Sequence, residues 1–298
     1  MSQTTQPAGA PRAAAPDVND AGFQQKLADL EDLLRSYGSI AIACSGGVDS
    51  SFLAAVCDRC MPDRTVLVHV RSAMVPAVER RGFEDLRGRL SLPAIEIEED
   101  AFDDPQVTKN SPHRCYFCKF TEFGGVIDVA RERGIETVID GSHSEDEGDY
   151  RPGLKATAEL GVRSPLREAG WTKAEERAWL EAWGMPAAKQ ASSACLASRI
   201  PYGEKITREK VELVARCESY LEELGFSVVR VRLSNFRAAI EVGPDERARL
   251  FDVDLLDRID AAFRELGCKD VLVRARGYSQ GSMNSALSAE TIAASTLT

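Results

Sequence analysis

Two kinds of apolar pattern alternate along the first two thirds of the chain. Short runs of consecutive apolar residues, typical of buried strands, lie at 39–44, 65–70, 94–97 and 136–139. Apolar residues at helical spacing predict helices over 21–37, up to about residue 60, 76–90 and 117–133. Strands that alternate with helices predict an α/β fold with a doubly wound parallel sheet. Binding loops are then expected beyond the carboxyl ends of the strands.

The pattern changes after about residue 200. A helix over 207–224, strands at 228–233 and 238–242, a helical stretch over 244–266 and a last strand at 271–275 predict a smaller α+β unit. A chain of 298 residues suits about two domains. We therefore expect a disordered, proline-punctuated tail over 1–20, a nucleotide-binding domain over 21–200 and a second domain over 201–298, for substrate binding or oligomerisation.

Composition narrows the class of protein. Hydrophobic residues make up 44% of the chain and charged residues 28%, which are ordinary values for a globular protein. The formal net charge of −10 argues against non-specific nucleic-acid binding. No apolar run has the length of a membrane span, and the first 20 residues do not resemble a secretory signal. Eight cysteines in such a chain indicate reduced thiols and a cytoplasmic protein.

A glycine loop follows the first predicted strand and precedes a helix. It reads Ser45-Gly46-Gly47-Val48-Asp49-Ser50. Glycines allow the backbone to approach an anion, and the free amides of a helix amino end attract negative charge. Ser45 and Ser50 can add hydroxyl donors, whereas Asp49 suits a phosphate site only if it holds a cation such as Mg²⁺. The loop lacks the lysine of the Walker P-loop. It therefore predicts a phosphate cradle of another kind.

Three cysteines are candidates for sulfur or metal chemistry. Cys115 and Cys118 are spaced C-x₂-C at the start of a predicted helix, on the same sheet edge as the glycine loop, where a helix amino end lowers a thiol's pKa. Cys195 lies far on in the sequence. Three thiolates can hold a [4Fe–4S] cluster with one open iron, or zinc together with water or His113. The residues alone leave both alternatives open.

Other conspicuous residues are predicted to be structural. Cys57 and Cys60 are also spaced C-x₂-C, but they lie about ten residues into the helix, about 15 Å from the glycine loop. Small buried hydrophobic residues or packing aromatic residues are expected at a further set of positions, which comprises Cys44, Cys217, Cys268, Trp171, Trp179 and Trp183.

Several motifs resemble one enzyme family. The glycine loop is similar to the PP-loop of the ATP pyrophosphatase superfamily, whose members cleave ATP between the α and β phosphates. More specific motifs, in chain order, resemble the LarE-type ATP-dependent sulfur transferases of that superfamily. These motifs are Asp140-Gly141-Ser142 with Asp146, Asp149-Tyr150-Arg151-Pro152-Gly153, the segment from Cys195 to Gly203, Val229-Arg230-Val231-Arg232, and Gly281-Ser282-Met283-Asn284.

The resemblance implies a reaction. Enzymes of this family adenylate a carboxylate of pyridinium-3,5-biscarboxylic acid mononucleotide and convert it to a thiocarboxylate, in the biosynthesis of the nickel-pincer nucleotide. In one style, a cysteine at the position of Cys195 gives up its own sulfur and becomes dehydroalanine. In the other, it joins a C-x-x-C pair to hold a [4Fe–4S] cluster that carries the sulfide. Since Cys115 and Cys118 are present, the chain resembles the second style.

The resemblance also assigns binding residues and partners. Arg230 and Arg232 share one face of a strand and suit the phosphate of the mononucleotide. Arg199, in the Cys195 motif, is expected to help to bind a cofactor or substrate. Ser45, Gly46, Gly47, Asp49 and Ser50 are expected to bind MgATP. The family also implies a sulfide donor and a homo-oligomer built from trimers.

Two other functions are compatible with the residues. A tRNA thiolase of the same superfamily would need a basic surface or a nucleic-acid module, and this acidic chain shows neither. A non-catalytic adenine-nucleotide sensor with a structural zinc would use the same glycine loop and the same three cysteines. Release of pyrophosphate, tRNA binding and metal content distinguish the three functions.

Overall fold

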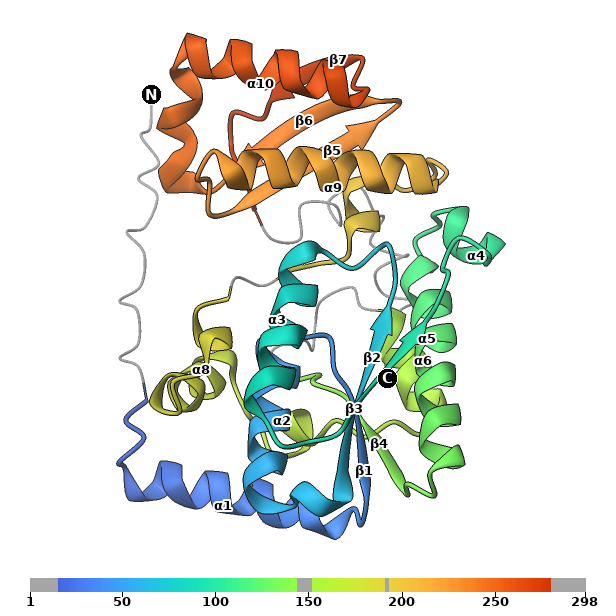
Figure 1. Ribbon diagram of the computed structural model, residues 1–298, viewed down its shortest axis with the longest axis vertical. Coiled ribbons are helices and arrows are strands. Elements are labelled where there is room, and N and C mark those ends of the chain that lie inside the picture. The colour runs from blue at the N-terminus through green and yellow to red at the C-terminus, as the bar shows by residue number, and fades with distance from the viewer. Residues whose placement is uncertain (1–15, 144–151, 191–192, 280–298) are drawn as a thin grey trace, which may run out of the picture.

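The structure is a computed structural model, and it describes residues 16–143, 152–190 and 193–279. The described chain forms two lobes, each built around its own sheet (Figure 1). The first lobe contains α1 (Ala21–Ser36), β1 (Ile40–Ala43), α2 (Val48–Cys60), η1 (Pro62–Arg64), β2 (Thr65–Arg71), α3 (Ala77–Arg89), β3 (Ala94–Glu98), α4 (Pro105–Thr108), α5 (Arg114–Glu132), β4 (Thr137–Ile139), α6 (Pro152–Glu159), α7 (Pro165–Glu168), α8 (Lys173–Ala182) and η3 (Pro186–Lys189). The rest of the described chain contains η4 (Leu196–Arg199), α9 (Arg208–Glu223), β5 (Val229–Ser234), β6 (Arg237–Val242), η5 (Pro244–Phe251), α10 (Val253–Leu266) and β7 (Asp270–Val273).

The sheet of the first lobe is entirely parallel and has the order β3-β2-β1-β4. Helices cover both faces, with α2 and α3 on one and α5 and α6 on the other (Figure 1). Ile40 and Ile42 of β1 pack into the core beneath α1, α2 and α8, whereas Ala41 packs on the opposite face with α5. Burial on both faces explains the continuous apolar runs in the sequence. The predicted α/β fold with a doubly wound parallel sheet is confirmed.

The strand order places a switch point between β1 and β4. From β1 the chain proceeds to β2 and β3 on one side, and it returns to β4 on the other side. Ligands of open α/β sheets bind beyond the carboxyl ends of the strands at such a point. The glycine loop follows β1, and Asp140-Gly141-Ser142 follows β4, so both motifs lie at this crevice. This edge of the sheet faces the second lobe (Figure 1).

The second lobe is a three-stranded sheet with two helices, as the pattern predicts. β5 and β6 form an antiparallel hairpin, and α10 connects β6 to the parallel strand β7. Asn235 and Phe236 make the turn with φ angles of 50° and 65°, values typical of a two-residue hairpin turn. Val229, Val231 and Leu233 pack against α9 and α10, which leaves the opposite face of the sheet for polar residues.

The two lobes share buried surface. Met74 and Val107 from loops of the first lobe pack into the core of the second lobe. Leu196, Ala197 and Ile200, on the expected boundary at residue 200, belong to the same core. The loops that follow β2 and β3 are therefore joined to the segment that carries Cys195.

Two element boundaries differ from the prediction. The helical stretch over 244–266 divides into η5 and α10, because the Asp252 side chain accepts a hydrogen bond from Leu255 N and starts a new helix. Helix α5 begins at Arg114 instead of residue 117, and its first turn includes Cys115. The expected tail lies mostly in residues 1–15, outside the described residues. Among the described helices, none is long and apolar enough to cross a membrane.

Candidate functional site

The glycine loop is held in shape by close packing against α3. Gly46 has a φ angle of +83°, which side chains other than glycine rarely adopt. A Cβ at Gly46 would lie 2.4 Å from Glu79 O and 2.3 Å from Phe83 N. A Cβ at Gly82 would lie 2.3 Å from Gly46 O. The loop therefore requires glycine on both sides of its contact with α3.

The amino end of α2 can receive an anion. Gly47 is the N-cap of α2, and no side chain caps the helix. The Ser45 hydroxyl accepts a hydrogen bond from Gly47 N at 3.2 Å and lies 3.4 Å from the Ser50 hydroxyl. The first amides of an α-helix have no partners within the helix, so they bind phosphate readily. These features fit the predicted role of the loop in ATP binding.

Asp49 has two partners on α8. It forms an ion pair with Lys173, and its carboxylate hydrogen-bonds with Glu176, which is fully buried. Burial acts to raise the pKa of Asp49, but Glu176 and Lys173 together hold it below its usual value. Asp49 therefore carries a negative charge at neutral pH, as a Mg²⁺ ligand must. Gly141 lies against it, since a Cβ there would be 2.8 Å from Asp49 Cβ.

The C-x₂-C pair lies on the first turns of α5, as expected. Buried Arg114 connects it to the segment of Cys195: its Nη2 lies 3.7 Å from Cys115 Sγ, and its Nη1 donates to Ala197 O at 3.2 Å. Arg114 Nη1 also donates to Asn110 Oδ1, whose amide nitrogen donates in turn to Pro201 O at 2.7 Å. This network positions Cys115 and Cys118 relative to the loop that carries Cys195.

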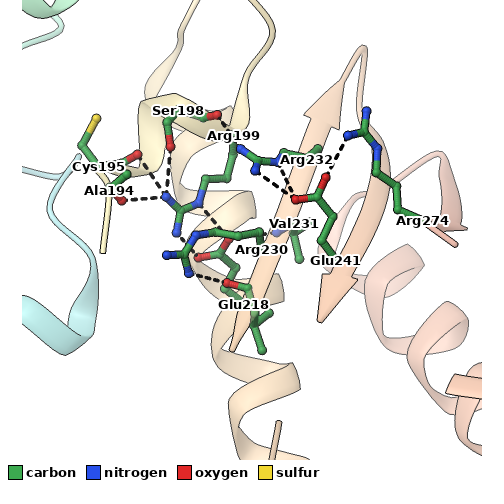
Figure 2. Close-up of polar contacts among 11 residues, drawn as sticks. Ala194, Cys195, Ser198, Arg199, Glu218, Arg230, Val231, Arg232, Glu241 and Arg274 are labelled. Carbon is green, nitrogen blue, oxygen red and sulfur yellow. Dashed lines mark hydrogen bonds and ion pairs between the residues drawn. The ribbon is translucent and has the colours of Figure 1, made fainter. Parts of the chain in front are cut away.

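Arg199 positions the Cys195 loop. Its Nη1 donates to Ala194 O at 2.6 Å and to Cys195 O at 3.2 Å, while its other nitrogens pair with both oxygens of Glu218 at 2.9 Å (Figure 2). The Arg199 side chain is 1% exposed. Its guanidinium group is therefore occupied by internal partners, and its expected part in ligand binding stays a prediction.

The three thiols lie in one neighbourhood but do not surround one point. Charges on Cys115 and Cys195 affect the pKa of Cys118, which shows their proximity. Burial raises the pKa of Cys118, so the expectation that the helix amino end favours its thiolate is wrong for the protein without a bound metal. Cys195 is exposed; the surrounding protein raises its pKa, and Arg114 opposes the rise.

The donor set fits an iron–sulfur cluster better than a single ion. Within the described ranges, no three His, Cys, Asp or Glu side chains are grouped closely enough to hold one metal ion. A [4Fe–4S] cluster holds its cysteines further apart than one ion does, because each thiolate binds a different iron. Three soft thiols from two connected segments meet that requirement in kind and number.

The polar face of the second sheet gathers arginines around one acid. Arg232 and Arg274 both pair with Glu241, which is 1% exposed, at 2.9 and 2.8 Å (Figure 2). Arg230 is opposite Glu241 in the strand pairing, and it is buried beside Tyr278. Burial and then the charge of Arg199 lower the pKa of Arg230. The strand is therefore not a solvated face.

This face has an excess of positive charge next to a pocket. Four arginines and two glutamates meet there, and the residues are Arg199, Arg230, Arg232, Arg274, Glu218 and Glu241 (Figure 2). A pocket of about 300 Å³ lies beside them and is lined in part by Arg232, Ser234 and Arg274. Arg232 also donates to Ser198 O at 3.0 Å, three residues after Cys195. An anionic group in this pocket would lie close to the Cys195 loop.

Sequence reasoning missed several residues of this site. Lys173 and Glu176 were not predicted because they begin an ordinary capped helix far along the chain. Glu79 and Gly82 belong to a helix that shows only the apolar spacing of a packed helix. Gly153, known only as part of a motif, packs on α5, since a Cβ there would be 3.0 Å from Lys119 Cγ. The motif residues Asp146, Asp149–Arg151 and 281–284 lie outside the described residues.

Comparison with known proteins gives a consistent result. No family model matches the chain. It is 33% identical over 263 residues to pyridinium-3,5-bisthiocarboxylic acid mononucleotide synthase of Lactiplantibacillus plantarum, an alignment that covers 88% of this chain and 95% of that protein. An uncharacterized protein of Synechocystis is 33% identical over 89% of this chain and 99% of its own length. The chain is also 28% identical to a glutamine-hydrolyzing GMP synthase of Archaeoglobus fulgidus, over 62% of this chain and 65% of that one. The chain therefore belongs to the LarE-type family of pyridinium-3,5-bisthiocarboxylic acid mononucleotide synthases.

Proposed function

We propose that this enzyme uses ATP to convert a carboxylate of pyridinium-3,5-biscarboxylic acid mononucleotide to a thiocarboxylate. The carrying observation is the cationic face formed by Arg230, Arg232 and Arg274, which lies beside the Cys195 loop. Its excess positive charge suits the phosphate of a mononucleotide. The name of the Lactiplantibacillus relative describes the bisthiocarboxylic product of such a reaction.

The first step needs the glycine loop. A substrate carboxylate oxygen attacks the α-phosphorus of ATP, the bond to the β-phosphate oxygen breaks, and an acyl adenylate and pyrophosphate form. The loop amides and the hydroxyls of Ser45 and Ser50 bind the phosphates. Asp49 holds Mg²⁺, which offsets the charge that develops on the leaving pyrophosphate. Adenylation converts a poor leaving group on the carboxylate into AMP.

The second step needs sulfur beside the acyl carbon. A sulfur nucleophile attacks the acyl carbon, a C–S bond forms, and the C–O bond to AMP breaks. We propose that Cys115, Cys118 and Cys195 hold a [4Fe–4S] cluster, which supplies an open iron for an added sulfide. Arg114 and Arg199 hold the two cysteine segments in place from opposite sides. In the alternative route Cys195 gives up its own sulfur and becomes dehydroalanine.

The remaining parts of the proposal concern partners and location. The enzyme takes its sulfide from a separate donor and acts in the cytoplasm. Several copies of the chain assemble, with trimers as the unit. The net charge of −10 supports a small-molecule substrate over a nucleic acid.

The overall reaction is tested with anaerobically purified protein, MgATP, sulfide and the biscarboxylic mononucleotide. We expect pyrophosphate, AMP and a product in which sulfur replaces one oxygen, detected by mass spectrometry. Iron and acid-labile sulfide are counted per chain in the same preparation. Pyrophosphate release that depends on tRNA would favour a tRNA thiolase, and nucleotide binding with zinc but without pyrophosphate release would favour a sensor.

The substrate site is tested with Arg232→Ala. We expect the KM for the mononucleotide to rise roughly 10- to 150-fold, which corresponds to one lost charge-assisted hydrogen bond of about 1.5–3 kcal/mol, while the KM for ATP changes little. Arg264→Ala, on the exposed side of α10, is the matched control. Equal effects on both substrates, with unchanged thermal stability, would remove Arg232 from the substrate site.

A further inference from the structure

The ion pair between Asp49 and Lys173 lies at the entrance to the glycine loop. Lys173 is the first residue of α8, and 124 positions separate it from Asp49 in the sequence. The Asp49 side chain is 28% exposed and that of Lys173 is 24% exposed. Neither end of the pair is therefore closed off from a ligand that enters the loop.

Helix α8 is anchored so that Lys173 has a defined position. Phe52 of α2 packs 4.8 Å from Trp171 and stacks on Trp183 at 5.8 Å, which joins α8 directly to the helix behind the glycine loop. The predicted packing role of these tryptophans is confirmed by their burial in this core. Lys26 of α1 fixes the first turn of α8 through an ion pair with Glu175 at 2.8 Å.

Phosphate binding would change the electrostatics of this pair. In the nucleotide-free protein Lys173 neutralises Asp49, which would otherwise repel a phosphate at the amino end of α2. When Mg²⁺ binds to Asp49, the lysine no longer has to neutralise this carboxylate. Glu176 still hydrogen-bonds with Asp49, so the carboxylate keeps its place when Lys173 changes partner.

We propose that Lys173 is a phosphate ligand, which neutralises Asp49 in the free protein and binds the pyrophosphate part of ATP when the nucleotide enters. This proposal rests on the proposed use of ATP, and it goes further by adding a residue from a second helix to the phosphate site. A lysine there offsets charge on the β and γ phosphates, and it continues to do so as pyrophosphate leaves. AMP lacks these phosphates, so Lys173 contributes nothing to its binding.

The test measures equilibrium binding by calorimetry in the presence of Mg²⁺. The ligands are AMP and an ATP analogue with a methylene group between the α and β phosphates, which cannot be cleaved there. For Lys173→Met we expect the analogue to bind roughly 10- to 100-fold more weakly, while AMP binds as it does to the wild type. Lys173→Arg should recover most of the affinity. Lys26→Met, the same change at the other ion pair of α8, should bind both ligands normally.

Three results would overturn the role of Lys173. These are unchanged analogue binding by Lys173→Met, equal losses for the analogue and AMP, and no recovery by Lys173→Arg. Circular dichroism establishes that each variant is folded, and Lys173→Gln replaces Lys173→Met if the latter is not. Failure of the wild type to bind the analogue would contradict the proposed function itself, whereas normal wild-type binding with an unaffected variant would contradict only this inference.

Discussion

Glu218→Gln tests how the Cys195 loop is held. Glu218 pairs with Arg199 through both oxygens at 2.9 Å, and its Oε1 also accepts a hydrogen bond from Val231 N at 2.8 Å. Glutamine keeps the shape of the side chain and one acceptor oxygen. It removes the negative charge, however, and turns the second oxygen into a donor that faces Arg199. The variant therefore leaves a buried guanidinium without its counter-charge.

The expected cost follows from burial. The side chains of Arg199 and Glu218 are 1% and 9% exposed. Removal of one partner from a buried pair costs about 3–5 kcal/mol, because the remaining charge is desolvated without compensation. The exposed pair of Asp260 and Arg264 on α10, with exposures of 43% and 52%, should contribute about 0–1 kcal/mol. Asp260→Asn is therefore the matched control.

The assay is urea unfolding followed by circular dichroism, with hydrogen exchange of residues 194–200 as a second measurement. We expect Glu218→Gln to lower the free energy of unfolding by about 3–5 kcal/mol and to speed exchange in this segment, since Arg199 holds the carbonyls of Ala194 and Cys195. A loss below about 1 kcal/mol, equal to that of Asp260→Asn, would show that the pair is not desolvated and that the reasoning is wrong.

Three other variants test the loop, the cysteines and α3. Cys115→Ala should lose both iron and sulfur transfer yet keep ATP binding; dehydroalanine at Cys195 after turnover, found by mass spectrometry, would contradict the cluster. Gly46→Ala should abolish nucleotide binding, because its Cβ would meet Phe83 N at 2.3 Å, and wild-type calorimetric affinity would refute this steric argument. Burial raises the pKa of Glu79 from 4.5 to about 7, so the folded state binds more protons than the unfolded state in that interval. The free energy of unfolding should therefore fall as pH rises from 4.5 to 7, and Glu79→Gln should flatten this slope; an unchanged slope in urea titrations would exclude Glu79 as its source.

Local patterns in the sequence determined the class of fold and the chemistry of the site. Consecutive apolar runs predicted the strands of the parallel sheet, because a strand covered on both faces has no polar side. Glycine at positions 46 and 47, between a strand and a helix, predicted the phosphate loop. The spacing of Cys115 and Cys118 predicted soft ligands at the same edge of the sheet. Each of these signals is local, so it can be read without knowledge of distant contacts.

Only the tertiary structure decided which distant residues meet at the site. Lys173 reaches Asp49 because aromatic packing fixes α8 against α2, and no pattern around Lys173 distinguishes it from other lysines at a helix start. The structure likewise pairs Arg199 with Glu218, an acid in the middle of an amphipathic helix. Such pairs depend on how helices and sheets pack, and the free energy of a buried charge depends on the groups around it in space and not on its neighbours in sequence.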